Sequence, residues 1–173
     1  KGVLSYTWTP PPPDSPQTLK AILYRGYNWA NMPAAVDAST SEYQIDEVAL
    51  LIRDLGITNR TNFGVTASSA SLQRNVLIEN YSYSTSLATM DNQAGNFDNF
   101  HNTIQSQIQA GQPLLLSFPS HMTVADGYMD DATGRKVHVN MGWGGYADDF
   151  YFLDRTEELV AGKYSTDAGN LDI

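Results

Sequence analysis

Hydrophobic positions in the first two thirds of the chain predict a strand followed by helices. Leu4, Tyr6 and Trp8 alternate with smaller residues, which is typical of a strand with one aromatic face. Ser41 and Gln44 form a capping-box pattern, and apolar residues at helical spacing follow them. The spacing predicts helices over 42–55, over about 72–80, and from 97 to just before Gly111.

The hydrophobic period changes to that of strands after Pro113. Apolar or alternating stretches at 114–118, 122–128, 137–140 and 150–153 are separated by turn residues. Helices followed by a run of antiparallel strands indicate the α+β class.

Composition narrows the classes of partner. The chain has 173 residues, enough for one domain, which could be built as two small lobes. Ten basic and 19 acidic residues give a net charge of −9, which repels phosphate backbones and anionic membranes. The longest apolar run, Val48–Ile52, is far shorter than the ~20 residues of a membrane span. We therefore expect neither nucleic acid nor membrane as a partner.

Metal and cofactor sites are not predicted either. The chain has no cysteine, which excludes thiolate ligands, disulfides and a thiol nucleophile within it. No two histidines have the spacing of metal ligands, and the acidic residues near 126–131 and 148–149 fit turns. Gly142–Gly145 follows a strand but opens no helix, so it does not fit a dinucleotide-binding loop.

Of the three histidines, His121 is the best candidate for acid–base chemistry. His101 lies within a predicted helix and is interpreted as a structural or surface residue, and His138 fits the polar face of a strand. His121 begins a predicted strand. If that strand pairs antiparallel with 137–140, Asn140 lies near His121, and an amide oxygen that accepts the ring N–H would orient a general base. A hairpin with an incidental His and Asn is the alternative.

Several short motifs follow one another in order along residues 1 to about 153. They are Lys1–Thr9, Tyr27-Asn28-Trp29, Leu55-Gly56-Ile57, Leu72-Gln73-Arg74, His121 with Val124, Asp126 and Gly127, His138-Val139-Asn140, Gly142-Trp143-Gly144-Gly145, and Asp149–Leu153. In their order and spacing, these motifs resemble the streptopain family of bacterial secreted cysteine proteases.

The resemblance implies a papain-like fold, with helices followed by a twisted antiparallel β-sheet or half-barrel. It also implies a secreted endopeptidase that cleaves polypeptides with a Cys–His pair and needs no metal or cofactor. His121 would be the catalytic base, Asn140 the orienting residue, and Trp143 a shield for the histidine. Ser69 and Ser120 would line the substrate cleft.

The sequence departs from the family pattern at the nucleophile. The family's catalytic Cys lies on a helix upstream of the position that matches Lys1. We therefore expect residues 1–173 to be a single domain, the C-terminal part of a papain-like catalytic domain. Its Cys would come from an upstream segment or a separate chain, and residues 1–173 alone would be inactive. Met141 and Ser120 stand where the family usually has Trp and Gly.

Two other hypotheses remain open. The chain could be a non-catalytic papain-like module that binds a peptide or a partner protein. It could also use a serine with His121 and Asp126, although strand alternation places Asp126 on the opposite face from His121.

Overall fold

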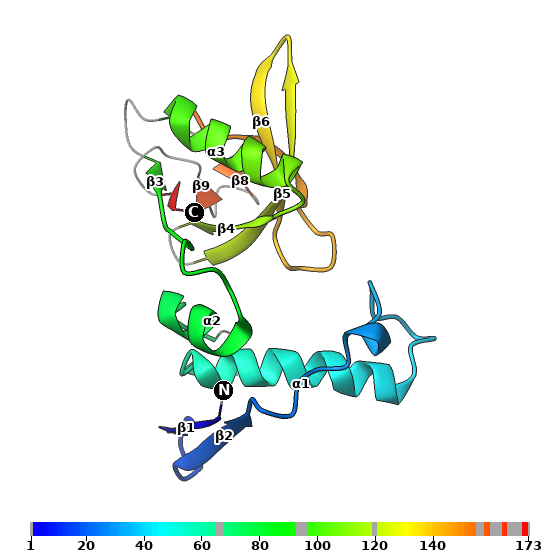
Figure 1. Ribbon diagram of the computed structural model, residues 1–173, viewed down its shortest axis with the longest axis vertical. Helices are drawn as coiled ribbons and strands as arrows, with labels where there is room; N and C mark the ends of the chain where they lie inside the picture. The colour runs from blue at the N-terminus through cyan, green and yellow to red at the C-terminus, as the bar shows by residue number, and fades with distance from the viewer. Residues whose placement is uncertain are drawn as a thin grey trace. The chain divides into compact units, whose positions relative to one another are not determined.

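The structure of the protein is a computed structural model that describes residues 2–64, 68–92, 97–118, 121–154, 158–159, 164–165 and 171–172. The chain divides into two units, residues 1–87 and 88–173 (Figure 1). Each unit has its own buried hydrophobic cluster. Helices and antiparallel sheets confirm the α+β class. The expectation of a single domain stays a prediction.

The first unit packs a β-hairpin against a long helix. Its elements are β1 (Val3–Trp8), β2 (Gln17–Ile22), the 3-10 turn η1 (Trp29–Asn31), α1 (Glu42–Thr58) and α2 (Arg74–Tyr81). β1 and β2 pair antiparallel over six residue pairs. Ala21, Leu23 and Ile57 form the buried centre, so the hairpin and α1 share one small core.

Helix α1 begins where the sequence predicts. The Ser41 hydroxyl accepts the Gln44 N–H, and the Gln44 side chain accepts the Ser41 N–H, which completes the predicted capping box. The helix ends three residues later than expected, at Thr58. Near that end, the buried Asp54 carboxylate accepts hydrogen bonds from Arg25 at 3.0 Å and from the Tyr27 hydroxyl at 3.2 Å. This carboxylate ties the segment after β2 to α1.

Among the residues that the structure describes, the second unit contains one helix and a six-stranded antiparallel sheet in the order β3-β10-β4-β5-β6-β7. A separate two-stranded sheet joins β8 and β9. The elements are β3 (Asp91–Asn92), α3 (Phe97–Gln109), β4 (Leu114–Phe118), β5 (His121–Asp131), β6 (Gly134–Asn140), β7 (Asp149–Phe152), β8 (Glu158–Leu159), β9 (Tyr164–Ser165) and β10 (Leu171–Asp172).

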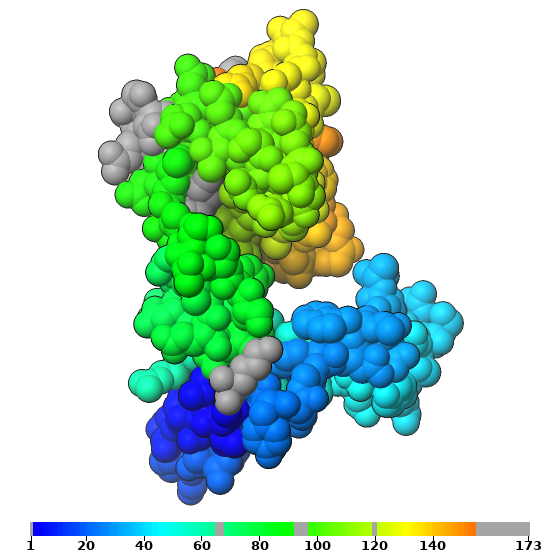
Figure 2. Space-filling model, in the orientation of Figure 1, coloured from blue at the N-terminus to red at the C-terminus, as the bar shows by residue number. Residues whose placement is uncertain are grey.

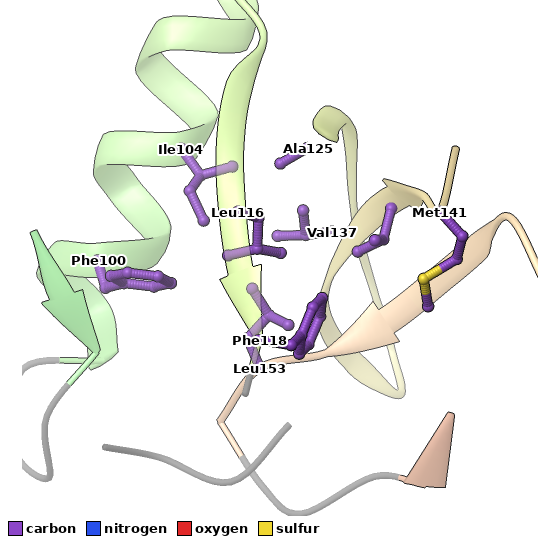
Figure 3. Close-up of a cluster of buried hydrophobic side chains, with 9 residues drawn as sticks. Phe100, Ile104, Leu116, Phe118, Ala125, Val137, Met141 and Leu153 are labelled. Atoms are coloured by element: carbon purple, nitrogen blue, oxygen red, sulfur yellow. The ribbon is translucent and has the colours of Figure 1, made fainter. Parts of the chain in front are cut away.

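The main core of the second unit lies between α3 and one face of the sheet. Phe100 and Ile104 from α3 point toward Leu116 of β4 and Val137 of β6, and all four are fully buried (Figure 3). Helical spacing on α3 and alternation on the strands bring these apolar faces together. The tip of the β5–β6 hairpin, coloured yellow, projects from the surface of the second unit (Figure 2).

Candidate active site

The candidate site lies where β4 ends, β5 begins and β6 ends. β5 begins at His121, which pairs with Phe118 of β4. β6 ends at Asn140, which pairs with Val124 of β5. The antiparallel pairing predicted from the sequence is therefore confirmed, and it brings the start of one strand to the end of the other.

The His121 ring is oriented by a backbone group. Its Nε2 lies 3.1 Å from the carbonyl oxygen of Met141, the residue that follows β6. A carbonyl oxygen only accepts hydrogen bonds, so Nε2 carries the proton in this contact and Nδ1 is the basic nitrogen of the neutral ring. The geometry selects one tautomer, as a general base requires.

Trp143 covers one face of the His121 ring. The two rings stack with centroids 4.6 Å apart and planes inclined by 26°. Trp143 is 36% exposed, so its other side reaches the surface. The indole therefore limits the access of water to the histidine while it remains part of the surface of the site.

A glycine-rich turn presents Trp143. Gly142 and Gly144, on either side of it, have φ values of +75° and +67°, which favour glycine. The Asp148 carboxylate accepts the Met141 N–H at 2.7 Å, and the Asn140 side-chain oxygen accepts the Gly142 N–H at 2.8 Å. These two bonds fix the turn that supplies both the carbonyl and the indole.

The predicted site residues are not all used in the same way. His121, Asn140 and Trp143 lie together in the second unit. The ring N–H of His121 is accepted by the Met141 carbonyl, while the Asn140 amide oxygen shapes the Trp143 turn. The role of Asn140 as the orienting residue stays a prediction.

The structure describes only one of the two predicted cleft residues. Ser69 belongs to the first unit, where it forms an isolated β-bridge with Asn62 and lines a cavity of ≈ 830 Å³. Ser120 lies outside the described residues. Their roles in substrate binding stay predictions.

Sequence reasoning missed the backbone carbonyl of Met141 and the carboxylate of Asp148. A carbonyl is present at every residue, so it carries no sequence signal. Asp148 was interpreted only as a turn residue, and its position in a glycine-rich turn after a strand is the signal that could have indicated it. Asp126 contacts His138 at 2.5 Å, on the face of the sheet away from the core, which gives no support to a Ser, His121 and Asp126 triad.

The described residues offer neither a group of metal ligands nor a membrane-spanning helix. Within the described ranges, no group of three or more His, Asp or Glu side chains could hold a metal ion. The helices of that same part of the chain are too short or too polar to cross a membrane.

Residues 1–151 match the family model of the peptidase C10 family. The chain belongs to the peptidase C10 family. It is 30% identical over 170 residues to streptopain from Streptococcus pyogenes serotype M28, covering 94% of this chain and 43% of the relative. It is 25% identical over 151 residues to the thiol protease/hemagglutinin PrtT of Porphyromonas gingivalis, covering 83% and 17%. The predicted resemblance to streptopain is thereby confirmed.

Solved structures show the same fold. Active wild-type interpain A, a cysteine protease of Prevotella intermedia, matches with a TM-score of 0.79 and 23% identity, over 99% of this peptidase C10 chain and 72% of interpain A. A prointerpain A fragment from the same organism matches with a TM-score of 0.77 and 22% identity, over 99% and 55%. The papain-like α+β prediction is confirmed. This C10 chain spans less than half the length of the streptopain relatives that it matches.

Proposed function

We propose that this chain carries the histidine of a secreted, bacterial, streptopain-like cysteine endopeptidase that hydrolyses peptide bonds in polypeptides. The cysteine comes from an upstream segment or a companion chain, because residues 1–173 contain none. Without it, this chain alone is inactive. The observation that carries the proposal is the His121 ring, held through Nε2 by the Met141 carbonyl and stacked on Trp143.

His121 first activates the nucleophile in the proposed reaction. Nδ1 takes the thiol proton, and the resulting imidazolium stabilises the thiolate. The thiolate attacks the peptide carbonyl, and the imidazolium returns the proton to the leaving amine as the C–N bond breaks. His121 then takes a proton from water as the water oxygen attacks the thioester carbonyl. The C–S bond breaks, the acid product leaves, and the thiolate again faces the imidazolium. These reaction steps need no metal or cofactor.

The neighbouring groups support this cycle by holding one geometry. The Met141 carbonyl accepts from Nε2 in both the neutral and the protonated ring, so the contact survives each proton transfer. Trp143 shields that hydrogen bond from water. Asn140 assists the orientation of His121, and Ser69 and Ser120 bind the polypeptide substrate.

The direct test replaces His121 in a protein that joins this chain to its cysteine segment. His121→Ala should reduce kcat/KM for peptide cleavage by at least about 10²-fold, because general acid–base catalysis is lost. Met122→Ala is the matched control, since Met122 is the next residue and is 45% exposed. It should stay within about twofold of wild type. Retained cleavage in a folded His121→Ala variant would contradict the proposal.

A non-catalytic, peptide-binding module is the second candidate. Met141 and Ser120 favour it, because they stand where the family usually has Trp and Gly. It predicts that the joined protein binds unstructured peptides but cleaves none, and that His121→Ala leaves binding unchanged. Cleavage that depends on His121 would exclude this candidate.

A further inference from the structure

The pairing of β5 with β6 contains one irregularity. Ala125 pairs with Val139, but the next pair is Gly127 with His138, so Asp126 is an additional residue in β5. An additional residue in one strand is a β-bulge, which bends the strand and changes which side chains face each side of the sheet.

The additional residue is held by the opposite strand. The Asp126 Oδ1 atom lies 2.5 Å from Nδ1 of His138, and the two side chains are 37% and 29% exposed. The carboxylate accepts a short, charge-assisted hydrogen bond from the Nδ1–H group. The edge of the His138 ring also meets the Phe150 ring of β7, with centroids 5.0 Å apart. His138 is therefore fixed from both sides.

Gly127 allows the two strands to approach at this point. A Cβ built on Gly127 would lie only 2.9 Å from the Cβ of His138. Any side chain at position 127 would push β5 away from His138 and stretch the contact with Asp126. The bulge is thus defined by three residues, Asp126, Gly127 and His138.

The bulge decides which way the first half of β5 faces. Before it, Thr123 and Ala125 are buried on the core side; after it, Tyr128 pairs with the buried Val137. Odd-numbered residues thus face the core before Asp126 and even-numbered residues after it. A uniform register would turn the first half over, because a slip of one residue exchanges the faces of a strand. His121 is in that half.

Contacts beyond the bulge hold the second half of the hairpin: Arg135 donates to Asn102 of α3 at 2.6 Å, and Lys136 pairs with Asp131 at 3.6 Å. Beyond the bulge, Asp130, Asp131 and the turn residues are exposed, and the tip projects from the second unit (Figure 2). These contacts lie beyond the bulge, whereas the pair of Asp126 and His138 is a side-chain contact between the bulge itself and β6.

We propose that Asp126 and His138 are positioning residues for His121. Their contact fixes the bulge, and the bulge fixes the register that places His121 against the Met141 carbonyl and Trp143. The structural part of this proposal stands on the hairpin alone; only its catalytic consequence rests on the proposed function.

The first test measures the position of the His121 ring by NMR on residues 1–173. Stacking on Trp143 shifts the His121 ring protons through the indole ring current. Asp126→Ala and His138→Leu should lose this shift and the cross-strand contact between Val124 and Asn140. His138→Leu keeps the apolar packing, so it remains informative if the alanine variant fails to fold.

A rescue variant separates positioning from general stability. In His138→Asn, the amide nitrogen stands close to where Nδ1 stood and can donate to Asp126, so the ring-current shift should return. Lys136→Met is the matched control. It removes an ion pair with Asp131, 3.6 Å long, from the same two strands without touching the bulge, and should leave the shift unchanged. Wild-type shifts in both Asp126→Ala and His138→Leu would overturn the proposal.

The second test measures peptide cleavage in the protein joined to its cysteine segment. Asp126→Ala and His138→Leu should each lower kcat by about 10- to 100-fold, the effect of a misplacement of about 1 Å, with KM changed much less. The double variant should be no worse than either single one, because both break the same contact. His138→Asn should recover most of the activity.

The two readouts separate the two proposals. An inactive wild-type protein would reject the proposed function, and the NMR test would still decide the role of the pair. Loss of activity in His138→Leu with an unchanged His121 signal would overturn the positioning role instead.

Discussion

His101 is a buried histidine whose replacement should stabilise the second unit. It lies on α3 with none of its surface exposed, 5.8 Å from the Phe97 ring. Among the residues that the structure describes, neither ring nitrogen has a hydrogen-bond partner; the nearest carboxylate oxygen, of Asp130, is 4.0 Å from Nε2. Leu has a similar volume and no polar atoms, so His101→Leu is the informative change.

The expected gain follows from the cost of unsatisfied polar atoms. A buried polar atom without a hydrogen bond costs about 1–3 kcal/mol of stability. Imperfect packing around the new leucine offsets part of the stability gained by removing such atoms. We therefore expect His101→Leu to raise the free energy of unfolding by about 1–3 kcal/mol at pH 8, where the histidine is neutral in both states.

The gain should increase at acid pH. Burial first, and then the charge of Arg135, lower the pKa of His101 from 6.5, and together they outweigh the opposing effects of Asp130, the Lys136 backbone and Asp154. A lowered pKa means that the unfolded chain binds the proton first as the pH falls. Stability is thus lost as the pH decreases from about 6.5 toward the pKa of the folded state. The leucine variant lacks this loss.

Urea unfolding of residues 1–173 at pH 8, 6 and 5 measures both effects. The free energy of unfolding of the variant should exceed that of the wild type at pH 8, and by a larger amount at pH 5. A variant that is less stable at pH 8, with a difference that does not change with pH, would refute the reasoning about an unsatisfied neutral ring.

Two further predictions concern stability. Asp54→Ala removes the buried acceptor of Arg25 and Tyr27 and should lower the free energy of unfolding of the first unit by about 2–3 kcal/mol, measured in urea. A loss of less than about 0.5 kcal/mol, the size typical of a surface substitution, would contradict the stabilising role of this carboxylate. Leu116→Ala should leave a cavity beside Ile104 and cost about 2–5 kcal/mol, seen as a lower thermal midpoint of the second unit, and an unchanged midpoint would argue against that core.

Local signals explain what the sequence could predict. Helix α1 follows from the capping box at Ser41 and the apolar spacing after it, both of which lie within a few residues of each other. The strands that became β4, β5, β6 and β7 follow from alternation and turn residues. β2 was not predicted, because Gln17–Ile22 has little alternation and follows a proline-rich stretch.

Features that depend on distant partners could not be predicted. β3 and β10 contain two residues each and exist only because they pair with each other and with β4. The bulge at Asp126 depends on His138, twelve residues away. The antiparallel pairing did predict that His121 and Asn140 approach, but it did not indicate that the Met141 carbonyl accepts the ring N–H.

The central claim is that His121 activates a cysteine thiol, and the rate of thiol alkylation against pH tests it most directly. The protein that joins this chain to its cysteine segment would be treated with iodoacetamide from pH 4 to pH 9 and followed by intact mass. We predict one alkylated cysteine that reacts well below the ordinary thiol pKa of about 8.5, and a His121→Ala variant that reacts only near that value. Identical profiles for the two proteins would contradict the account.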